Sequence, residues 1–278
     1  MIDFKALEIA PPPDTTCVDI SDRLSKGRFY KFSKNFNCFY FKRCLKAFTL
    51  AEVLVTLGII GIVSAMTVPS LMQNHQRKTY VTQLHKVYNE LQQAFMLEMT
   101  EKNAVDLREA GLGVPGNMKG FIQKHFKVVQ TCDNGIKTPC FVTDYKNLNG
   151  TVLAYNQSGW SCGNCAAIAS GASICVDNVK CYSSSYGGYS TNYGYIFVDI
   201  NGQKGPNILG RDAFVMSYFP DGVIDLPLIT PACRTKGVCN GNSIQAIRES
   251  GTTCEASTNY EHQQCLGKLL NNNWEMTY

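Results

Sequence analysis

The stretch KAFTLAEVLVTLGIIGIVSAMTVPSLM, residues 46–72, decides how the chain is organised. From Phe48 to Met72 the run is almost wholly apolar, and as a helix with a rise of about 1.5 Å per residue it would span roughly 37 Å. Because the hydrocarbon core of a bilayer is about 30 Å thick, the run predicts a membrane-spanning helix. Two residues are unusual in such a helix: the single acid Glu52 near its start and Pro69 near its end.

The charge balance changes at this run. Residues 1–47 contain nine Lys or Arg and five Asp or Glu, whereas residues 48–278 contain 17 of each kind. The whole positive excess therefore precedes the apolar run, and a basic flank beside a spanning segment stays in the cytoplasm. We interpret residues 1–47 as a basic cytoplasmic leader and expect residues 48–278 to lead outward. Nucleic-acid binding by the leader is the competing interpretation, which the adjoining apolar run disfavours.

The distribution of the cysteines also supports an outward location for residues 48–278. Three of the thirteen lie in the leader, and an even number remains, as disulfide formation in an oxidising compartment would require. The disulfide candidates are Cys132, Cys140, Cys162, Cys165, Cys175, Cys181, Cys233, Cys239, Cys254 and Cys265. Three pairs are close enough in sequence to staple local loops: Cys132/Cys140, Cys233/Cys239 and Cys254/Cys265. The connectivity as a whole stays open.

Two other uses of cysteine are compatible with the spacing. Cys162 and Cys165 form a C-x-x-C pair, as in redox proteins, and together with Cys175 and Cys181 they are spaced to bind zinc. We favour structural disulfides, because no strand–helix–strand pattern surrounds the pair and an oxidising compartment disfavours zinc. We interpret residues 162–188, which are rich in Ser, Gly and Cys, as a disulfide-pinned loop.

Beyond Pro69 the apolar residues follow the rhythm of a helix with one buried stripe. They recur at Tyr80, Leu84, Val87, Tyr88, Leu91 and Phe95. The sequence therefore predicts one helix from Phe48 to about Glu101, membrane-spanning over residues 48–72 and amphipathic over residues 73–101. An extracytoplasmic, disulfide-rich globular head over residues 102–278 would follow.

The head shows weaker signals for helices and strands. We expect a short helix at 119–126 and strands at 141–145, 151–155, 193–200 and 213–219. The predicted fold class is α+β, with the long N-terminal helix packed on a small antiparallel β-sheet that carries disulfide-pinned loops.

The segment Lys46-Ala47-Phe48-Thr49-Leu50-Ala51-Glu52, followed by an apolar helix with a late proline, resembles the prepilin-type cleavage and methylation segment. That segment belongs to type IV pilins and to the pseudopilins of type II secretion. In the family, a membrane peptidase cuts before the phenylalanine and methylates the new amine, and a glutamate stands fifth in the mature chain. Counted from Phe48, Glu52 is fifth and Pro69 is twenty-second, where the family has its proline.

The chain departs from the family pattern in two ways. The family usually has glycine before the cut, where this chain has Ala47, and its basic leader is usually shorter than 47 residues. An ordinary signal peptide, cut after its apolar stretch, is the alternative. The downstream segment Ser64-Ala65-Met66 lacks a clear small-x-small ending for such a cut.

The resemblance implies a structural subunit and not an enzyme. Prepilin peptidase would cut between Ala47 and Phe48 and methylate Phe48, and the helix would then assemble into a type IV pilus or a type II secretion pseudopilus. The implied partners are prepilin peptidase, other pilin or pseudopilin subunits and an inner-membrane assembly platform. The precursor would be a single-pass protein of the bacterial inner membrane with a cytoplasmic N-terminus, and the assembled filament would be extracytoplasmic.

Several functional alternatives stay open at this point. The implied filament would be a pilus, a secretion pseudopilus or a DNA-uptake filament, and the 231 residues that follow the expected cut, which are many for a principal subunit, favour a minor subunit. From another class, a monomeric membrane-anchored extracytoplasmic binding or redox module is the competing function.

The acid and the proline of the helix each allow two interpretations. A carboxylate in lipid costs about 2.5–3.5 kcal/mol at the helix centre and less near the end, so Glu52 requires a partner. The resemblance implies that Glu52 complements the N-terminal charge of an adjacent subunit, and that Pro69 lets the helix bend as the subunit leaves the bilayer. A snorkelling acid and a passive kink are the structural alternatives.

The segment 199–212, DINGQKGPNILGRD, is the most distinctive part of the head. Oxygen-bearing side chains at Asp199, Asn201 and Asp212 predict a possible calcium loop, which the major pseudopilins also have in their C-terminal part. A turn in which Asp and Asn bond their own backbone is the alternative, and it is favoured because Lys204 and Arg211 add positive charge. We expect no other cofactor, and no catalytic residue, since no catalytic motif is present.

Overall fold

One helix, α1 (Leu50–Glu101), accounts for the N-terminal part of the computed structural model, as the sequence predicts. The structure describes residues 48–132, 138–154, 163–185, 188, 190–250, 254 and 264–278. The leader, with Ala47, lies outside the described residues. The chain divides into two compact units after Pro69, so that α1 contributes its first part to one unit and the rest to the other.

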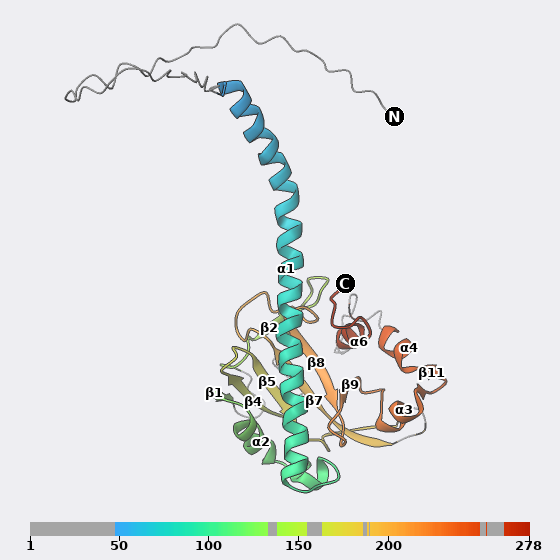
Figure 1. Cartoon of the computed structure of the whole chain (residues 1–278). Coiled ribbons are helices and arrows are strands. Elements are labelled where there is room, and N and C mark those ends of the chain that lie inside the picture. The colour runs from blue at the N-terminus through green and yellow to red at the C-terminus, as the bar shows by residue number, and fades with distance from the viewer. Residues whose placement is uncertain are drawn as a thin grey trace, which may run out of the picture. The chain divides into compact units, whose positions relative to one another are not determined.

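The second unit is the α+β head that the sequence predicts (Figure 1). Its shorter helical segments are η2 (Arg108–Leu112), α2 (Asn117–His125), α3 (Pro231–Lys236), α4 (Ile244–Glu249) and α6 (Gln264–Asn271). Its strands are β1 (Val128–Cys132), β2 (Asp144–Lys146), β3 (Val152–Ala154), β4 (Gly163–Ile168), β5 (Ser173–Asp177), β6 (Tyr182–Ser184), β7 (Thr191–Asp199), β8 (Ala213–Tyr218), β9 (Ile224–Asp225), β10 (Val238–Cys239) and β11 (Asn242–Ser243).

The main sheet has seven strands in the order β1-β4-β5-β7-β8-β9, with β6 paired to β7, and every pairing is antiparallel. The strands predicted at 193–200 and 213–219 correspond to β7 and β8. Those predicted at 141–145 and 151–155 correspond to β2 and β3, which form a separate two-stranded sheet. The helix predicted at 119–126 corresponds to α2.

The main sheet is covered on both faces, and the alternation of strand residues separates two cores. In β7, Ile196 and Val198 belong to the larger core, whereas Phe197, which points the other way, belongs to the smaller one. The larger core contains the α1 stripe, and Figure 1 shows the second half of α1 lying across the strands. The smaller core contains Phe141 and Tyr145, from the segment that runs into β2.

The α1 stripe matches the pattern read from the sequence. Leu84, Val87, Leu91 and Phe95 are buried, and Tyr80 and Tyr88 are partly buried against the same core. The Phe95 ring stacks on Tyr218 of β8, with centroids 4.6 Å apart, and on Phe121 of α2, with centroids 5.3 Å apart. Phe95 therefore joins the helix, the sheet and α2 at one point.

The interpretation of residues 162–188 as a loop is wrong for its described part. Strands β4, β5 and β6 lie there, and β4 and β5 are adjacent in the sheet. Cys165 lies directly opposite Cys175 in the β4–β5 pairing, and the two form a disulfide. The cysteines are thus cross-strand partners within a sheet. Because every residue of β5 is buried, the strand has no exposed face to give the alternation that marks a strand in the sequence.

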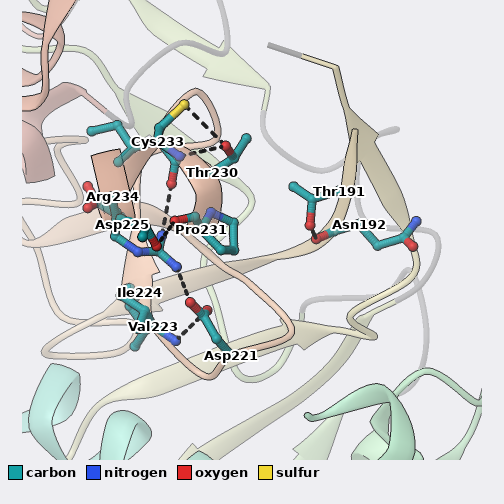
Figure 2. Close-up of polar contacts among 12 residues, drawn as sticks. Thr191, Asn192, Asp221, Val223, Ile224, Asp225, Thr230, Pro231, Cys233 and Arg234 are labelled. Carbon is teal, nitrogen blue, oxygen red and sulfur yellow. Dashed lines mark hydrogen bonds and ion pairs between the residues drawn. The ribbon is translucent and has the colours of Figure 1, made fainter. Parts of the chain in front are cut away.

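The C-terminal segment of the head is held by polar contacts. Thr230 caps α3 by accepting a hydrogen bond from the Cys233 backbone N–H, and Pro231 occupies the first turn, where its missing donor has no cost. Arg234 donates to Asp221 and to the Ile229 carbonyl, as Figure 2 shows for its pairing with Asp221. These contacts tie α3 to the β8–β9 turn.

A second ion pair ties α4 to the sheet. Arg248 donates through Nη2 to Asp225 Oδ2 over 2.6 Å and through Nε to Asp225 Oδ1 over 3.1 Å, and Asp225 is buried. After α6, Trp274 returns to α1, where its ring stacks on His85 with centroids 4.2 Å apart. The last residues of the chain therefore pack on its first helix.

We expect Phe95→Ala to lower the free energy of unfolding of the head by about 3–5 kcal/mol, because the variant leaves a cavity between three elements. The measurement is chemical unfolding of the full chain in detergent, followed by the near-ultraviolet circular dichroism of the head. Leu97→Ala, two residues along on the exposed side of α1, is the control and should change the value by no more than about 0.5 kcal/mol. Equal effects of the two variants would contradict the packing described.

Candidate functional site

The first turn of α1 contains a reciprocal contact between Thr49 and Glu52. The Thr49 backbone N–H donates to Glu52 Oε2 over 2.9 Å, and the Thr49 hydroxyl donates to the same oxygen over 3.0 Å. In return, the Glu52 backbone N–H donates to Thr49 Oγ1 over 3.2 Å. This is a capping box, in which Thr and Glu three residues apart satisfy donors that the first turn leaves unpaired.

The capping box gives Glu52 a role within its own chain. A carboxylate at a helix N-terminus is also favoured by the macrodipole, so the position is the least costly one for an acid in this segment. The Thr-x-x-Glu spacing can be read from the sequence. The capping box was nevertheless not predicted, because Glu52 was considered only as a charge that requires a partner. Both contacts of the Glu52 carboxylate use Oε2 and leave the second oxygen, Oε1, outside the box.

The part of α1 that precedes the head is apolar and exposed. An 18-residue window of the helix has a mean hydropathy of 2.0, and none of it is buried. The core helix of a soluble protein would be equally apolar but covered by the rest of the protein. The exposed large apolar side chains in this part of α1 are Leu50, Val53, Leu54, Val55, Leu57, Ile59, Ile60, Ile62, Val63, Met66, Val68, Leu71 and Met72.

Pro69 lies inside α1 and marks the last residue of the first unit. A proline in a helix interior removes one backbone donor and crowds the carbonyl one turn earlier, which weakens the helix locally. Nevertheless α1 continues through Pro69 to Glu101. Glu52 and Pro69 therefore stand near the two ends of one exposed apolar segment.

The described disulfides are Cys132–Cys140, Cys165–Cys175, Cys233–Cys239 and Cys254–Cys265. Three of them join the pairs that were singled out as local staples. Cys181 is disulfide-bonded as well, and Cys162 lies outside the described residues. The redox and zinc alternatives are wrong, because Cys165 is bonded to Cys175 and not to its C-x-x-C neighbour.

The connection between β7 and β8 brings Asp199, Asn201 and Asp212 together around buried hydrogen bonds. Asp199 Oδ2 accepts from the Tyr145 hydroxyl over 2.6 Å, and Asp199 Oδ1 accepts from the Asn201 backbone N–H over 3.2 Å. Asp212 accepts from the backbone N–H groups of Asn207, over 2.8 Å, and Ile208, over 2.6 Å. Tyr145, on β2, was not predicted from the sequence as part of this cluster, because it is distant along the chain.

Burial dominates the electrostatics of the two acids. Burial raises the pKa of Asp199 to about 7, and the nearby charge of Asp212 raises it further. The hydrogen bond from the Tyr145 hydroxyl acts in the opposite direction and lowers this pKa. Burial also raises the pKa of Asp212, although its bonds to Ile208 and Asn207 oppose the rise. Both side chains are fully buried.

These contacts support the turn interpretation of this segment. Each carboxylate oxygen already accepts an N–H or O–H bond, as in a turn that Asp and Asn side chains organise. Within the described residues, no group of three His, Cys, Asp or Glu side chains is placed to hold a metal ion. Calcium binding through Asp199, Asn201 and Asp212 stays a prediction.

A further buried acid, Glu98, was not predicted from the sequence as part of a cluster. Glu98 lies on α1, where its Oε2 is 2.7 Å from Lys124 Nζ and 2.8 Å from His125 Nε2, both on α2. Burial raises the pKa of Glu98, but these two partners outweigh it and hold the pKa below its usual value. The cluster attaches α2 to α1, and no sequence pattern links residues so far apart.

We expect Thr49→Ala to destabilise the first turn of α1 by about 0.5–2 kcal/mol, because the variant removes the cap. Hydrogen exchange of the amides of residues 50–53 in detergent micelles measures the loss as faster exchange. Thr56→Ala is the matched control, since the Thr56 hydroxyl only donates to the carbonyl of Val53 within the helix. Similar exchange in both variants would show that the capping box does not stabilise the helix start.

Comparison with known proteins agrees with the features of this segment. The family model for the prokaryotic N-terminal methylation motif matches residues 42–68, which include Phe48, the capping box and most of the exposed apolar helix. No curated protein and no solved structure is detectably similar to the chain. The N-terminal segment of the chain therefore carries a prokaryotic N-terminal methylation motif, the kind of segment that pilin-like proteins have.

Proposed function

We propose that the chain is the precursor of a structural subunit that assembles through α1 into a type IV pilus or a type II secretion pseudopilus. The observation that carries the proposal is a methylation motif that ends in a fully exposed apolar helix. Prepilin peptidase cuts between Ala47 and Phe48 and methylates the Phe48 amine. An inner-membrane assembly platform then transfers the subunit from the bilayer to the filament.

The exposed helix supports assembly on physical grounds. Removing a Val, Leu or Ile side chain from water is favourable by about 1.5–3 kcal/mol, and the first part of α1 exposes many such side chains. Lipid covers them before assembly. In the filament, the corresponding helices of neighbouring subunits replace the lipid, and the heads lie outside the cytoplasm.

Glu52 sets the register of neighbouring helices in this proposal. Its Oε2 remains in the capping box, and Oε1 meets the N-terminal amine of an adjacent subunit. A stagger that leaves this charge unpaired in an apolar environment is penalised, so one register is selected. Pro69 weakens the helix near the head and lets it bend as the subunit leaves the membrane.

The size of the head supports a minor subunit. Residues 102–278 make a head that is large for the principal subunit of a filament, which has to pack against copies of itself along the whole length. The chain would then occupy specialised positions among smaller pilin or pseudopilin subunits.

Processing is tested by mass spectrometry of the N-terminus. After coexpression with a prepilin peptidase, we expect a mature chain that begins with N-methylated Phe48, whereas the chain expressed alone keeps its leader. An intact leader in both samples, or a cut near Ala65, would contradict the proposal. Either result would favour the monomeric membrane-anchored module.

The role of Glu52 in assembly is tested with two substitutions that separate charge from capping. We expect Glu52→Val and Glu52→Gln both to insert into the membrane normally and to be absent from sheared filaments, because both remove the charge. Gln retains the side-chain oxygen that a capping box requires, so Glu52→Gln isolates the charge.

Glu275→Val, which removes an exposed acid of the head, is the control and should assemble normally. If Glu52→Gln also assembles normally while Glu52→Val does not, capping rather than charge pairing is the function of Glu52 in the filament.

A further inference from the structure

The part of α1 that enters the head is basic. The sequence has no acid between Glu52 and Glu90, so no carboxylate on this part of the helix balances its cations. Arg77 and Lys78 are the first Lys or Arg after Met72, the last residue of the apolar run. The Lys78 side chain is exposed and the Arg77 side chain is half-buried. Positive charge therefore follows the apolar run directly.

Arg77 and Arg211 differ from the other arginines of the head in their charge partners. Arg108, Arg234 and Arg248 each form an ion pair with an aspartate, over 2.5 or 2.6 Å. None of the ion pairs in the described part of the chain includes Arg77 or Arg211. Both guanidinium groups are therefore available to an anion that the head does not itself supply.

Tyr80 connects these two arginines. Arg77 precedes Tyr80 by three residues on α1, and side chains with this spacing are neighbours on the surface of a helix. Burial and the charge of Asp212 raise the pKa of Tyr80, whereas the charge of Arg211 lowers it, so Arg211 lies beside the same tyrosine. The Asp212 carboxylate is buried and accepts two backbone N–H groups of its own loop. Arg77 and Arg211 thus flank Tyr80 from α1 and from the β7–β8 connection.

The same end of the head has aromatic side chains of the kind that lie at membrane interfaces. Tyr80 and Trp274 are half-buried against the larger core, and the Trp274 ring stacks on His85 of α1. Figure 1 shows the C-terminus beside α1 at the end of the head where the helix enters. Tyr and Trp are enriched where protein passes from lipid to water. Glu275 is an exposed acid next to Trp274, but the three cations exceed it in charge.

Chain continuity determines how far these cations lie from the apolar run. Arg77 is five residues beyond Met72, which corresponds to about 8 Å along a helix. The headgroup layer on each side of the hydrocarbon core is about 5–7 Å thick, and long basic side chains extend towards it. The distance is measured along α1 and does not depend on how the helix bends at Pro69. We define the juxtamembrane surface as the following set: Arg77, Lys78, Tyr80 and Arg211.

We propose that the juxtamembrane surface holds the head against the bilayer by binding the phosphate groups of anionic phospholipids. Guanidinium groups pair with phosphate through two parallel hydrogen bonds, and Lys or Arg near an anionic membrane surface is attracted to it. A soluble polyanion offers the same chemistry, but the chain's own anchor brings lipid phosphate to this surface. The contact has to break when the subunit leaves the membrane.

The proposal rests on one part of the proposed function, the insertion of the first part of α1 into a bilayer. It does not depend on cleavage or on filament assembly. It can therefore be tested on the full chain in a membrane, before any filament forms.

The test is hydrogen exchange, measured by mass spectrometry on the full chain in nanodiscs. One set of nanodiscs contains phosphatidylcholine alone, and the other contains an equal share of phosphatidylglycerol. With phosphatidylglycerol present, we expect the opening constants of residues 73–80 and 204–211 to fall about fivefold for each cation that engages lipid. Sodium chloride at about 0.5 M should remove the difference, because it screens the attraction.

Three variants identify the side chains responsible. The double variant Arg77→Gln/Arg211→Gln should lose most of the difference between the two bilayers and keep only the part that Lys78 supplies. Arg77→Lys retains the charge and should retain most of the difference. Lys119→Gln is the matched control, because Lys119 is an exposed cation on α2 that is absent from the described ion pairs. It should behave as the unmodified chain does.

The outcomes separate this proposal from the proposed function. Equal exchange in the two bilayers, or an unchanged difference in the double variant, would overturn the lipid contact and leave the proposed function intact. Inorganic phosphate that protects both segments equally well in phosphatidylcholine nanodiscs would also overturn it, because the surface would then be a site for free phosphate. A chain that enters neither kind of nanodisc would contradict the membrane insertion on which both proposals rest.

Discussion

The structure depends on one helix that has two different environments along its length. The first part of α1 is apolar around its whole circumference and exposed, and the second part buries a single stripe against the head. The stripe converges on Phe95, which stacks on Tyr218 of the sheet and Phe121 of α2. Because no polar face interrupts the first part, that part requires lipid or other apolar helices around it. The second part, in contrast, is covered by the core of the head, to which its stripe belongs.

Much of this organisation could be predicted from the sequence, because the signals for it lie between neighbouring residues of α1 and its flank. The apolar run, the change of charge before it and the spacing from Tyr80 to Phe95 each depend on residues close together in the chain. The helix, its buried stripe and the α+β class were therefore predicted correctly. The Thr49–Glu52 capping box was equally local, but it was missed because Glu52 was considered only as an unpaired charge.

The strands of the head were harder to predict for physical reasons. Strand β5 is buried on both faces, so its residues do not alternate between apolar and polar, and the cysteines around it suggest a loop. Its disulfide from Cys175 to Cys165 follows from strand register, which is a property of the folded sheet. The contacts of Tyr145 with Asp199 and of His125 with Glu98 also depend on the folded structure. Such pairs are brought together by topology, and no local pattern marks them.

The contact between Trp274 and His85 has a consequence for biosynthesis. The ribosome makes α1 long before residue 274, so the stack between Trp274 and His85 cannot form until residue 274 has been translated. Until then, part of the apolar stripe of α1 lacks its final cover, and long-range closure of this kind is slow compared with local helix formation. The nascent chain therefore has an interval in which a membrane or a chaperone has to shield that stripe.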